Sequence, residues 1–143
     1  TSPATTFVLA GVREALEDLA QAGIAIGMAT SKRRSSAEVL LEHLGIAHYF
    51  ACCIGPEDVA NAKPHPEPID TLMRRMNVSA PDFIYLGDTH LDTQSAQAAG
   101  IRCWAVTTGY ASRDKLMDAG ADEIFDNMTD VAKSVLKARR FTS

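Results

Sequence analysis

The chain has 143 residues, of which 46% are hydrophobic and 22% are charged, and its formal net charge is −4. This composition is typical of a single globular domain over residues 1–143 and excludes an intrinsically disordered chain. The scattered charges form no basic stripe for nucleic acid and no polybasic run for anionic lipid, and no apolar run approaches the ~20 residues of a membrane span. We therefore expect chemistry on a small molecule, with neither a nucleic acid nor a membrane as partner.

Helical and strand-like patterns alternate along the whole sequence. In chain order we predict a helix over 12–20, a strand over 24–29, a helix over 35–44, a strand over 50–54, a helix over 66–76, a strand over 83–87, a helix over 95–99, a strand over 101–106, a helix over 112–119, a strand over 123–125 and a helix over 128–136. Gly23, Gly45 and Gly100 supply left-handed stops, and Ser35 with Glu38 forms a capping-box pattern that opens the second helix.

The alternation predicts an α/β fold, a Rossmann-like three-layer sandwich. Apolar strands separated by amphipathic helices form a mainly parallel sheet that is covered on both faces. Ligands of such sheets bind outside the carboxyl ends of the strands. The three cysteines, at positions 52, 53 and 103, lie in these apolar segments without metal-ligand spacing, and we interpret them as reduced core residues of a cytoplasmic protein.

Polar residues follow three of the predicted strands. Thr30 and Ser31 follow the first, Lys63 lies in a proline-rich loop after the second, and Asp88 follows the third. We expect these residues to form one phosphate-binding site, in which the Thr30 hydroxyl donates to a phosphoryl oxygen and Lys63 neutralises its charge. In the alternative interpretation, Thr30 and Ser31 only turn the chain and Lys63 is a solvated loop residue.

Two aspartates follow the third strand at a spacing of four residues, Asp88 and Asp92. If a helix begins just after Asp88, both carboxylates face the same small volume. Few carboxylates together with phosphate and water oxygens suit Mg²⁺, and the cation would relieve the repulsion between the two carboxylates. The alternative makes Asp92 a helix cap and Asp88 a turn residue.

The ordered set of Thr30, Lys63, Asp88 and Asp92 resembles motifs two, three and four of the haloacid dehalogenase superfamily, and this resemblance covers nearly the whole chain. The segments that resemble its phosphoglycolate phosphatase-like branch are Ile26-Gly27-Met28-Ala29-Thr30-Ser31-Lys32, Lys63-Pro64-His65-Pro66-Glu67-Pro68, Gly87-Asp88-Thr89 to Asp92, and Thr108-Gly109-Tyr110.

The resemblance implies a Mg²⁺-dependent hydrolase of a small phosphorylated metabolite that works through an aspartyl-phosphate. It implies that Thr30 binds the phosphoryl group, that Lys63 steadies the phosphate and the nucleophile, that Asp88 coordinates Mg²⁺, and that Asp92 supports the metal or Lys63.

One element of the family has no counterpart in the sequence. The family's first motif is a strand that ends in two aspartates, of which the first attacks phosphorus and the second protonates the leaving oxygen. Asp126 also follows an apolar strand, but it lacks a second aspartate at the required spacing and reads as a turn residue. We therefore interpret the chain as the C-terminal part of the core domain, without the first strand and the cap domain, and expect it to be inactive alone.

The resemblance places the missing strand between those that carry Thr30 and Asp88, so we expect an incomplete sheet. A preceding segment of a longer chain, a homo-oligomer partner or a swapped segment would complete it, or a truncated protein would reorganise.

The competing function is a noncatalytic module that binds phosphate, metal or another protein. A phosphoryl-receiving signalling domain ranks lower, because its acceptor aspartate precedes the threonine and the lysine. His65 and His90 lie near the predicted site and read as loop residues.

Overall fold

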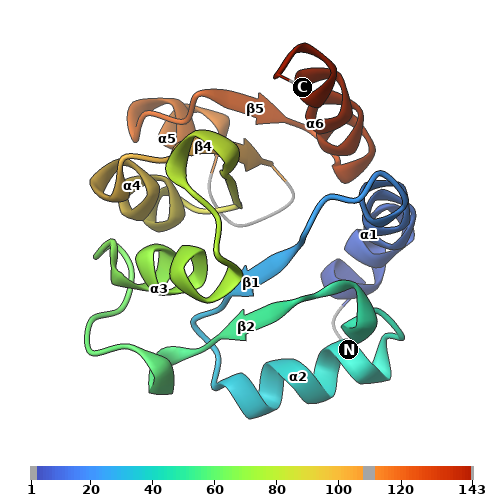
Figure 1. Ribbon diagram of the computed structural model, residues 1–143, viewed down its shortest axis with the longest axis horizontal. Helices are drawn as coiled ribbons and strands as arrows, with labels where there is room; N and C mark the ends of the chain where they lie inside the picture. The colour runs from blue at the N-terminus through green and yellow to red at the C-terminus, as the bar shows by residue number, and fades with distance from the viewer. Residues whose placement is uncertain (1–2, 108–111, 143) are drawn as a thin grey trace.

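The structure is a computed structural model that describes residues 3–107 and 112–142 (Figure 1). The α-helices are α1 (Pro3–Gln21), α2 (Arg34–His43), α3 (Glu67–Met76), α4 (His90–Ala99), α5 (Arg113–Asp118) and α6 (Met128–Thr142). The strands are β1 (Gly27–Ala29), β2 (Cys52–Ile54), β3 (Ile84–Gly87), β4 (Arg102–Val106) and β5 (Glu123–Phe125). Short 3₁₀ helices are η1 (Ala47–Tyr49), η2 (Pro56–Asp58) and η3 (Ala80–Asp82). The alternating α/β order is therefore confirmed.

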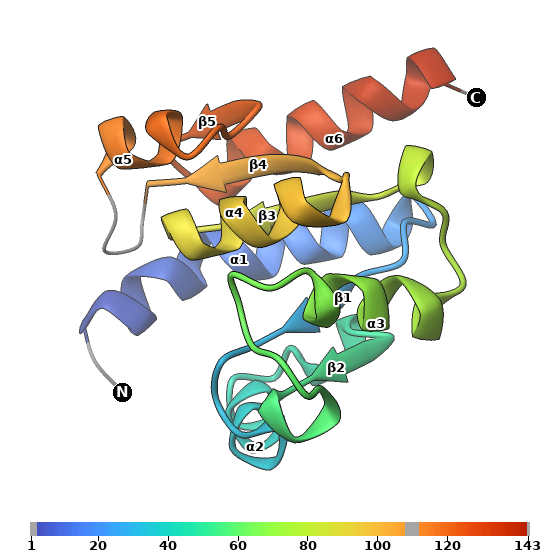
Figure 2. The same cartoon turned by 90° about the vertical axis from the view of Figure 1, so that its left-hand side faces the viewer.

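All strand pairs in the described residues are parallel, but they form two separate sheets. β1 pairs with β2, with Met28 opposite Cys53, while the second sheet has the order β3-β4-β5, with Leu86 opposite Trp104. Figure 2 shows the β1-β2 pair below the three-stranded sheet. The sheet is thus split between β1 and β3, where the resemblance placed the missing strand.

Helices hold the two sheets together on either side. α3 packs on β1 and β2 and against α4, which in turn packs on β3 and β4, while α1 packs against α6 on the opposite side (Figure 1). The main core cluster draws residues from both sheets and from α3 and α4: Ile54, Ile69, Leu72, Phe83, Tyr85, Ala96, Ile101 and Cys103. Each fully buried aliphatic or aromatic side chain contributes about 1.5–3 kcal/mol, so this shared core opposes separation of the sheets.

The start of α2 differs from its predicted capping box. Arg33 stands at the N-cap position without a side-chain cap, and Glu38 forms an ion pair with Arg34 at 3.3 Å. The Arg34 amide instead donates to the Glu57 carboxylate at 2.8 Å. A carboxylate distant in the sequence thus satisfies the helix start, so the prediction of a local cap by Ser35 is wrong.

Helix α4 begins at His90, five residues before the Ala-rich stretch that predicted it. Thr89 and Asp92 form a capping box, in which the Thr89 hydroxyl accepts from the Asp92 amide and the Asp92 carboxylate accepts from the Thr89 amide. The helix ends at Gly100 with φ 73°, as predicted. None of the helices in the described part of the chain combines the length and apolar character that a membrane crossing requires.

The close approach of β3 to α4 depends on Gly87. A Cβ atom at this position would lie 2.2 Å from Asp92 Cβ and 2.8 Å from its carboxyl carbon. We predict that Gly87→Ala lowers the free energy of unfolding by about 1–3 kcal/mol in urea titrations, because the start of α4 must shift. In the control Gly27→Ala, the new methyl group meets the ends of the Met76 and Leu72 side chains, and the loss should be smaller. A smaller loss in Gly87→Ala than in the control would contradict this packing.

Candidate active site

Strand β1 brings Thr30 to the carboxyl edge of the first sheet. The Thr30 amide donates to Ile54 O at 2.9 Å, and the Thr30 hydroxyl oxygen accepts from the Lys32 amide at 3.0 Å. The hydroxyl therefore turns the chain and still keeps its own proton for another acceptor. Ser31 follows in an exposed position, and its contact with phosphate stays a prediction.

Lys63 lies where the two sheets approach each other. Its Nζ donates to Ala29 O at the end of β1, at 3.1 Å, and to Asp92 Oδ1 on α4, at 2.7 Å. The Lys63 side chain is only 12% exposed. The interpretation of Lys63 as a solvated loop residue is therefore wrong, and its ammonium bonds to the carbonyl that directly precedes Thr30 in the chain.

The loop that carries Lys63 is fixed on both sides of the lysine. The Glu67 carboxylate accepts from the amides of Ala60 and Asn61, each at 2.9 Å. On the other side, Ser95 Oγ on α4 donates to His65 O at 2.7 Å. Sequence analysis noted only that this loop is rich in prolines and missed Glu67 and Ser95, because both contacts join residues that no local pattern connects.

Asp92 is a buried carboxylate that accepts hydrogen bonds on both oxygens. Lys63 Nζ and the Tyr85 hydroxyl, at 3.3 Å, donate to Oδ1, while the amides of Asp88 and Thr89 and the Thr89 hydroxyl donate to Oδ2 at 3.1–3.3 Å. Burial disfavours its charge, but Lys63 and these bonds outweigh burial, so the pKa of Asp92 lies below its usual value. Of the two roles expected for Asp92, this geometry favours support of Lys63 over direct metal ligation.

Asp88 lies beside Asp92 at the end of β3. Its carboxyl pKa is raised, first by burial against the surrounding protein and then by the negative charge of Asp92. A cation would relieve this penalty, so Asp88 fits a Mg²⁺ ligand. The described residues hold no group of three or more His, Cys, Asp and Glu side chains placed for a metal. To hold Mg²⁺, Asp88 would therefore need further oxygen ligands beside it, such as those of phosphate and water.

The hydrogen bonds connect the predicted site residues in one series. The Ala29 carbonyl, next to Thr30, accepts from Lys63, Lys63 pairs with Asp92, and Asp92 accepts from the Asp88 amide.

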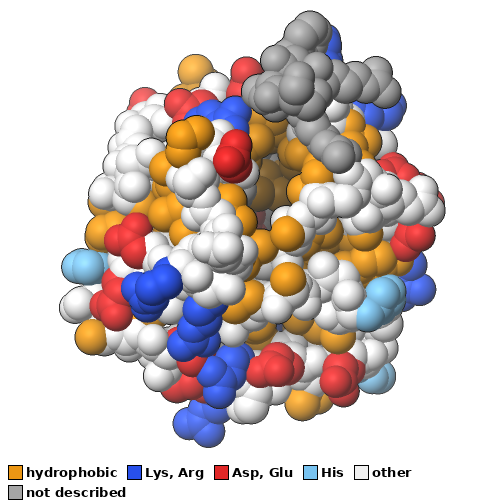
Figure 3. Space-filling view, in the orientation of Figure 1, with side chains coloured by type: hydrophobic (Ala, Val, Ile, Leu, Met, Phe, Trp, Pro, Cys, Tyr) orange, Lys and Arg blue, Asp and Glu red, His pale blue; other side chains and the backbone are white. Residues whose placement is uncertain are grey.

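Figure 3 shows that the face seen in Figure 1 is hollowed near its centre, between β1 and β4, and that hydrophobic side chains surround the hollow. The His65 Nδ1 atom accepts from the Glu67 amide at 3.0 Å, within the loop that carries Lys63.

Comparison with known proteins identifies the family. A family model described as haloacid dehalogenase-like hydrolase matches residues 4–106. The chain belongs to the haloacid dehalogenase-like hydrolases. Phosphoglycolate phosphatase of Salmonella paratyphi A is 35% identical over 126 residues, which cover 88% of this chain and 50% of that protein. This chain thus spans about half the length of the curated hydrolases that it matches.

Solved structures agree with this membership. A predicted phosphoglycolate phosphatase from Haemophilus somnus 129pt is 28% identical with a TM-score of 0.80, over 86% of this chain and 55% of that chain. A predicted phosphatase from Clostridium acetobutylicum is 28% identical with a TM-score of 0.81, over 88% of this chain and 58% of that chain. The resemblance to the haloacid dehalogenase superfamily and its phosphoglycolate phosphatase-like branch is confirmed.

We predict that Asp92→Asn costs about 3–5 kcal/mol of unfolding free energy at neutral pH, since it leaves the buried Lys63 ammonium without a counter-charge. Because the pKa of Asp92 is lowered in the fold, its contribution is present above the unfolded value of about 4 and is lost as the pH falls through the folded value. Chemical unfolding at several pH values should therefore show the cost shrinking below about pH 4.

The control for this variant is Asp126→Asn, which removes a carboxylate from the exposed pair of Arg113 and Asp126, 49% and 74% exposed. It should cost less than about 1 kcal/mol. Equal costs in the two variants would contradict the burial of the Lys63–Asp92 pair.

Asp88→Asn should leave stability unchanged or raise it at pH 7. A raised pKa means that the fold disfavours the ionised carboxyl, so removal of the charge removes a penalty. As the pH falls and the wild-type carboxyl becomes protonated, the two proteins should converge in thermal unfolding. A clearly lower Tm of the variant at pH 7 would show that the Asp88 carboxylate stabilises the fold.

Proposed function

We propose that the protein containing this chain is a Mg²⁺-dependent phosphomonoester hydrolase that acts on a small phosphorylated metabolite. The observation that carries this proposal is the buried Lys63 ammonium, shared between the carboxyl end of β1 and Asp92 and placed next to Thr30. A preorganised cation in a site of low water access stabilises the charge that develops on a transferring phosphoryl group. The similarity to phosphoglycolate phosphatases supports the same reaction class and makes 2-phosphoglycolate the first substrate to test.

In this proposal each site residue has one task. Thr30 and Ser31 donate to phosphoryl oxygens, Lys63 neutralises the phosphate, and Asp92 orients Lys63. Asp88 holds Mg²⁺, which when bound supplies positive charge against the phosphoryl oxygens.

The nucleophile of the proposed reaction lies outside the 143 residues, because they contain no strand that ends in two aspartates with one residue between them. We propose that an aspartate on a further strand attacks phosphorus and forms an aspartyl-phosphate, while the ester bond to the leaving oxygen breaks and that oxygen takes a proton. Water then cleaves the aspartyl-phosphate. The split between β1 and β3 supports the place of this strand, since it would pair with both free edges. An adjoining segment of a longer chain or a strand from a partner would provide it.

A noncatalytic module that binds phosphate or metal is the second candidate. It is favoured by the same missing nucleophile. The two candidates differ in one respect: both would bind orthophosphate at Thr30 and Lys63, but only the hydrolase would release it from a phosphomonoester.

The test is phosphate release from 2-phosphoglycolate by the longest natural chain that contains this sequence. We predict Mg²⁺-dependent turnover that chelation abolishes, and a loss of at least about a hundredfold in Lys63→Ala and in Asp88→Asn. Lys133→Ala, which alters an exposed lysine of α6, is the matched control and should keep wild-type activity. The 143-residue chain alone should not turn over. Full activity of Asp88→Asn, or of the wild type without divalent cations, would refute the proposal.

A further inference from the structure

Tyr85 is a buried residue with a polar group that the proposed reaction does not use. It lies on β3 and is 6% exposed. It shares the buried face of the strand with Gly87, two residues later. Its hydroxyl donates to Asp92 Oδ1 at 3.3 Å, and Lys63 Nζ lies 5.8 Å from the centroid of its ring. Tyr85 therefore contacts both members of the buried ion pair.

We propose that Tyr85 is a positioning residue that fixes the orientation of the Asp92 carboxylate and, through it, the Lys63 ammonium. The catalytic consequence rests on the proposed phosphohydrolase function. The positioning itself does not, since it concerns contacts within this chain.

We interpret the hydrogen bond to Asp92 as the reason why a tyrosine rather than a phenylalanine stands at position 85. Tyr85 belongs to an apolar core cluster that also contains Ile54, Ile69 and Leu72, so a phenylalanine would suit this core without a polar atom to desolvate. A buried hydroxyl is costly unless it finds an acceptor, and the acceptor here is Asp92 Oδ1.

The two carboxylate oxygens of Asp92 accept hydrogen bonds from different donors. Oδ1 receives Lys63 and Tyr85, while Oδ2 receives the amides of Asp88 and Thr89. Asp88 and Thr89 directly precede α4 and Asp92 lies in its first turn, whereas Tyr85 donates from strand β3. Its hydrogen bond therefore opposes rotation of the carboxylate and ties that rotation to the sheet.

The ring of Tyr85 acts on the lysine directly. A cation within about 6 Å of an aromatic centroid is attracted to the face of the ring, and the attraction is stronger when the cation is desolvated. Lys63 meets this condition. Tyr85→Phe thus removes only the hydroxyl bond, whereas Tyr85→Leu also removes the ring.

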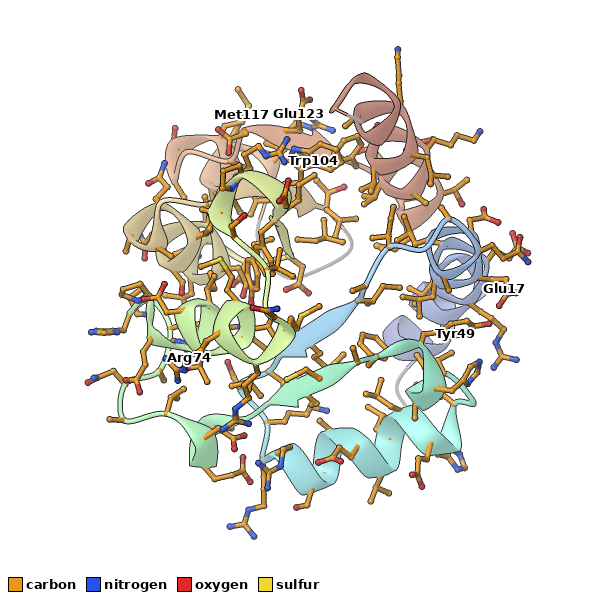
Figure 4. All side chains as sticks on the ribbon, in the orientation of Figure 1. Glu17, Tyr49, Arg74, Trp104, Met117 and Glu123 are labelled. Carbon is orange, nitrogen blue, oxygen red and sulfur yellow. The ribbon has the colours of Figure 1, made fainter. Side chains whose placement is uncertain are left out.

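The matched control is Tyr49→Phe. Tyr49 also donates its hydroxyl to a carboxylate, that of Glu17, and the two residues lie side by side on the far side of the molecule from α3 and α4 (Figure 4). Its substitution removes the same chemical group without touching Asp92 or Lys63.

Amide hydrogen exchange measured by NMR tests the positioning without any substrate. In Tyr85→Phe we expect the Asp88 and Thr89 amides to exchange about tenfold faster, the factor at the low end of the range for one lost hydrogen bond to a charged group. Exchange of core amides such as that of Ile101 provides the reference for global stability. Unchanged exchange at Asp88 and Thr89, or a rise only in step with the core or also in Tyr49→Phe, would overturn the inference.

Turnover of 2-phosphoglycolate by the longest natural chain is the second measurement. Tyr85→Phe should lower kcat about tenfold with little change in KM, and Tyr85→Leu should lower it further, while Tyr49→Phe keeps the wild-type value. A wild-type kcat in Tyr85→Phe would refute the catalytic consequence. Absence of turnover in the wild type would count against the proposed function instead, and hydrogen exchange would still decide the role of Tyr85.

Discussion

The ion pair between Lys63 and Asp92 is the interaction on which the rest of this structure depends. The two sheets share no strand pairing, and the ion pair links them because Lys63 bonds to the last carbonyl of β1 and Asp92 lies in the first turn of α4, the helix that follows β3. Both side chains are nearly buried, so neither charge is tolerable without the other. The pair therefore fixes the distance between the two halves at the edge where the phosphate site is proposed.

Fold and site use the same atoms at this edge. The Asp92 carboxylate completes the capping box of α4 and also neutralises Lys63, and Gly87 leaves the space that this carboxylate needs. The neighbouring Asp88 shows the opposite condition, since its pKa is raised rather than lowered. Asp92 thus stabilises the fold. At Asp88, burial and the charge of Asp92 disfavour ionisation, and a cation would relieve this penalty. This difference would separate the positioning of Lys63 from the proposed binding of Mg²⁺.

Much of the fold could be predicted from the sequence, since apolar strands and amphipathic helices leave strong periodic patterns. The position of Thr30, Lys63 and Asp88 followed from the rule that parallel strands end at a common edge. The start of α2 was predicted wrongly, because its cap comes from Glu57, a residue distant in the sequence. Thr89 and Asp92 do carry the spacing of a capping box, but Asp92 was interpreted first as a metal ligand.

The contacts that sequence reasoning missed are the ones that join separate elements. Tyr85 reaches Asp92 from a strand to the following helix, and Ser95 bonds to the loop that carries Lys63. In the sequence, Tyr85 is one more apolar strand residue and Ser95 one more small helix residue. Their roles depend on packing between elements, which periodicity does not encode.

An experimental structure of the longest natural chain with Mg²⁺ and orthophosphate tests the central claim most directly. The claim is that Lys63 is held by Asp92 for phosphate while Asp88 holds the metal. It predicts phosphate in contact with Thr30 and Lys63, Mg²⁺ on Asp88, and an intact bond between Lys63 and Asp92. Mg²⁺ bound to Asp92 with Lys63 displaced, or phosphate bound away from Thr30 and Lys63, would contradict it.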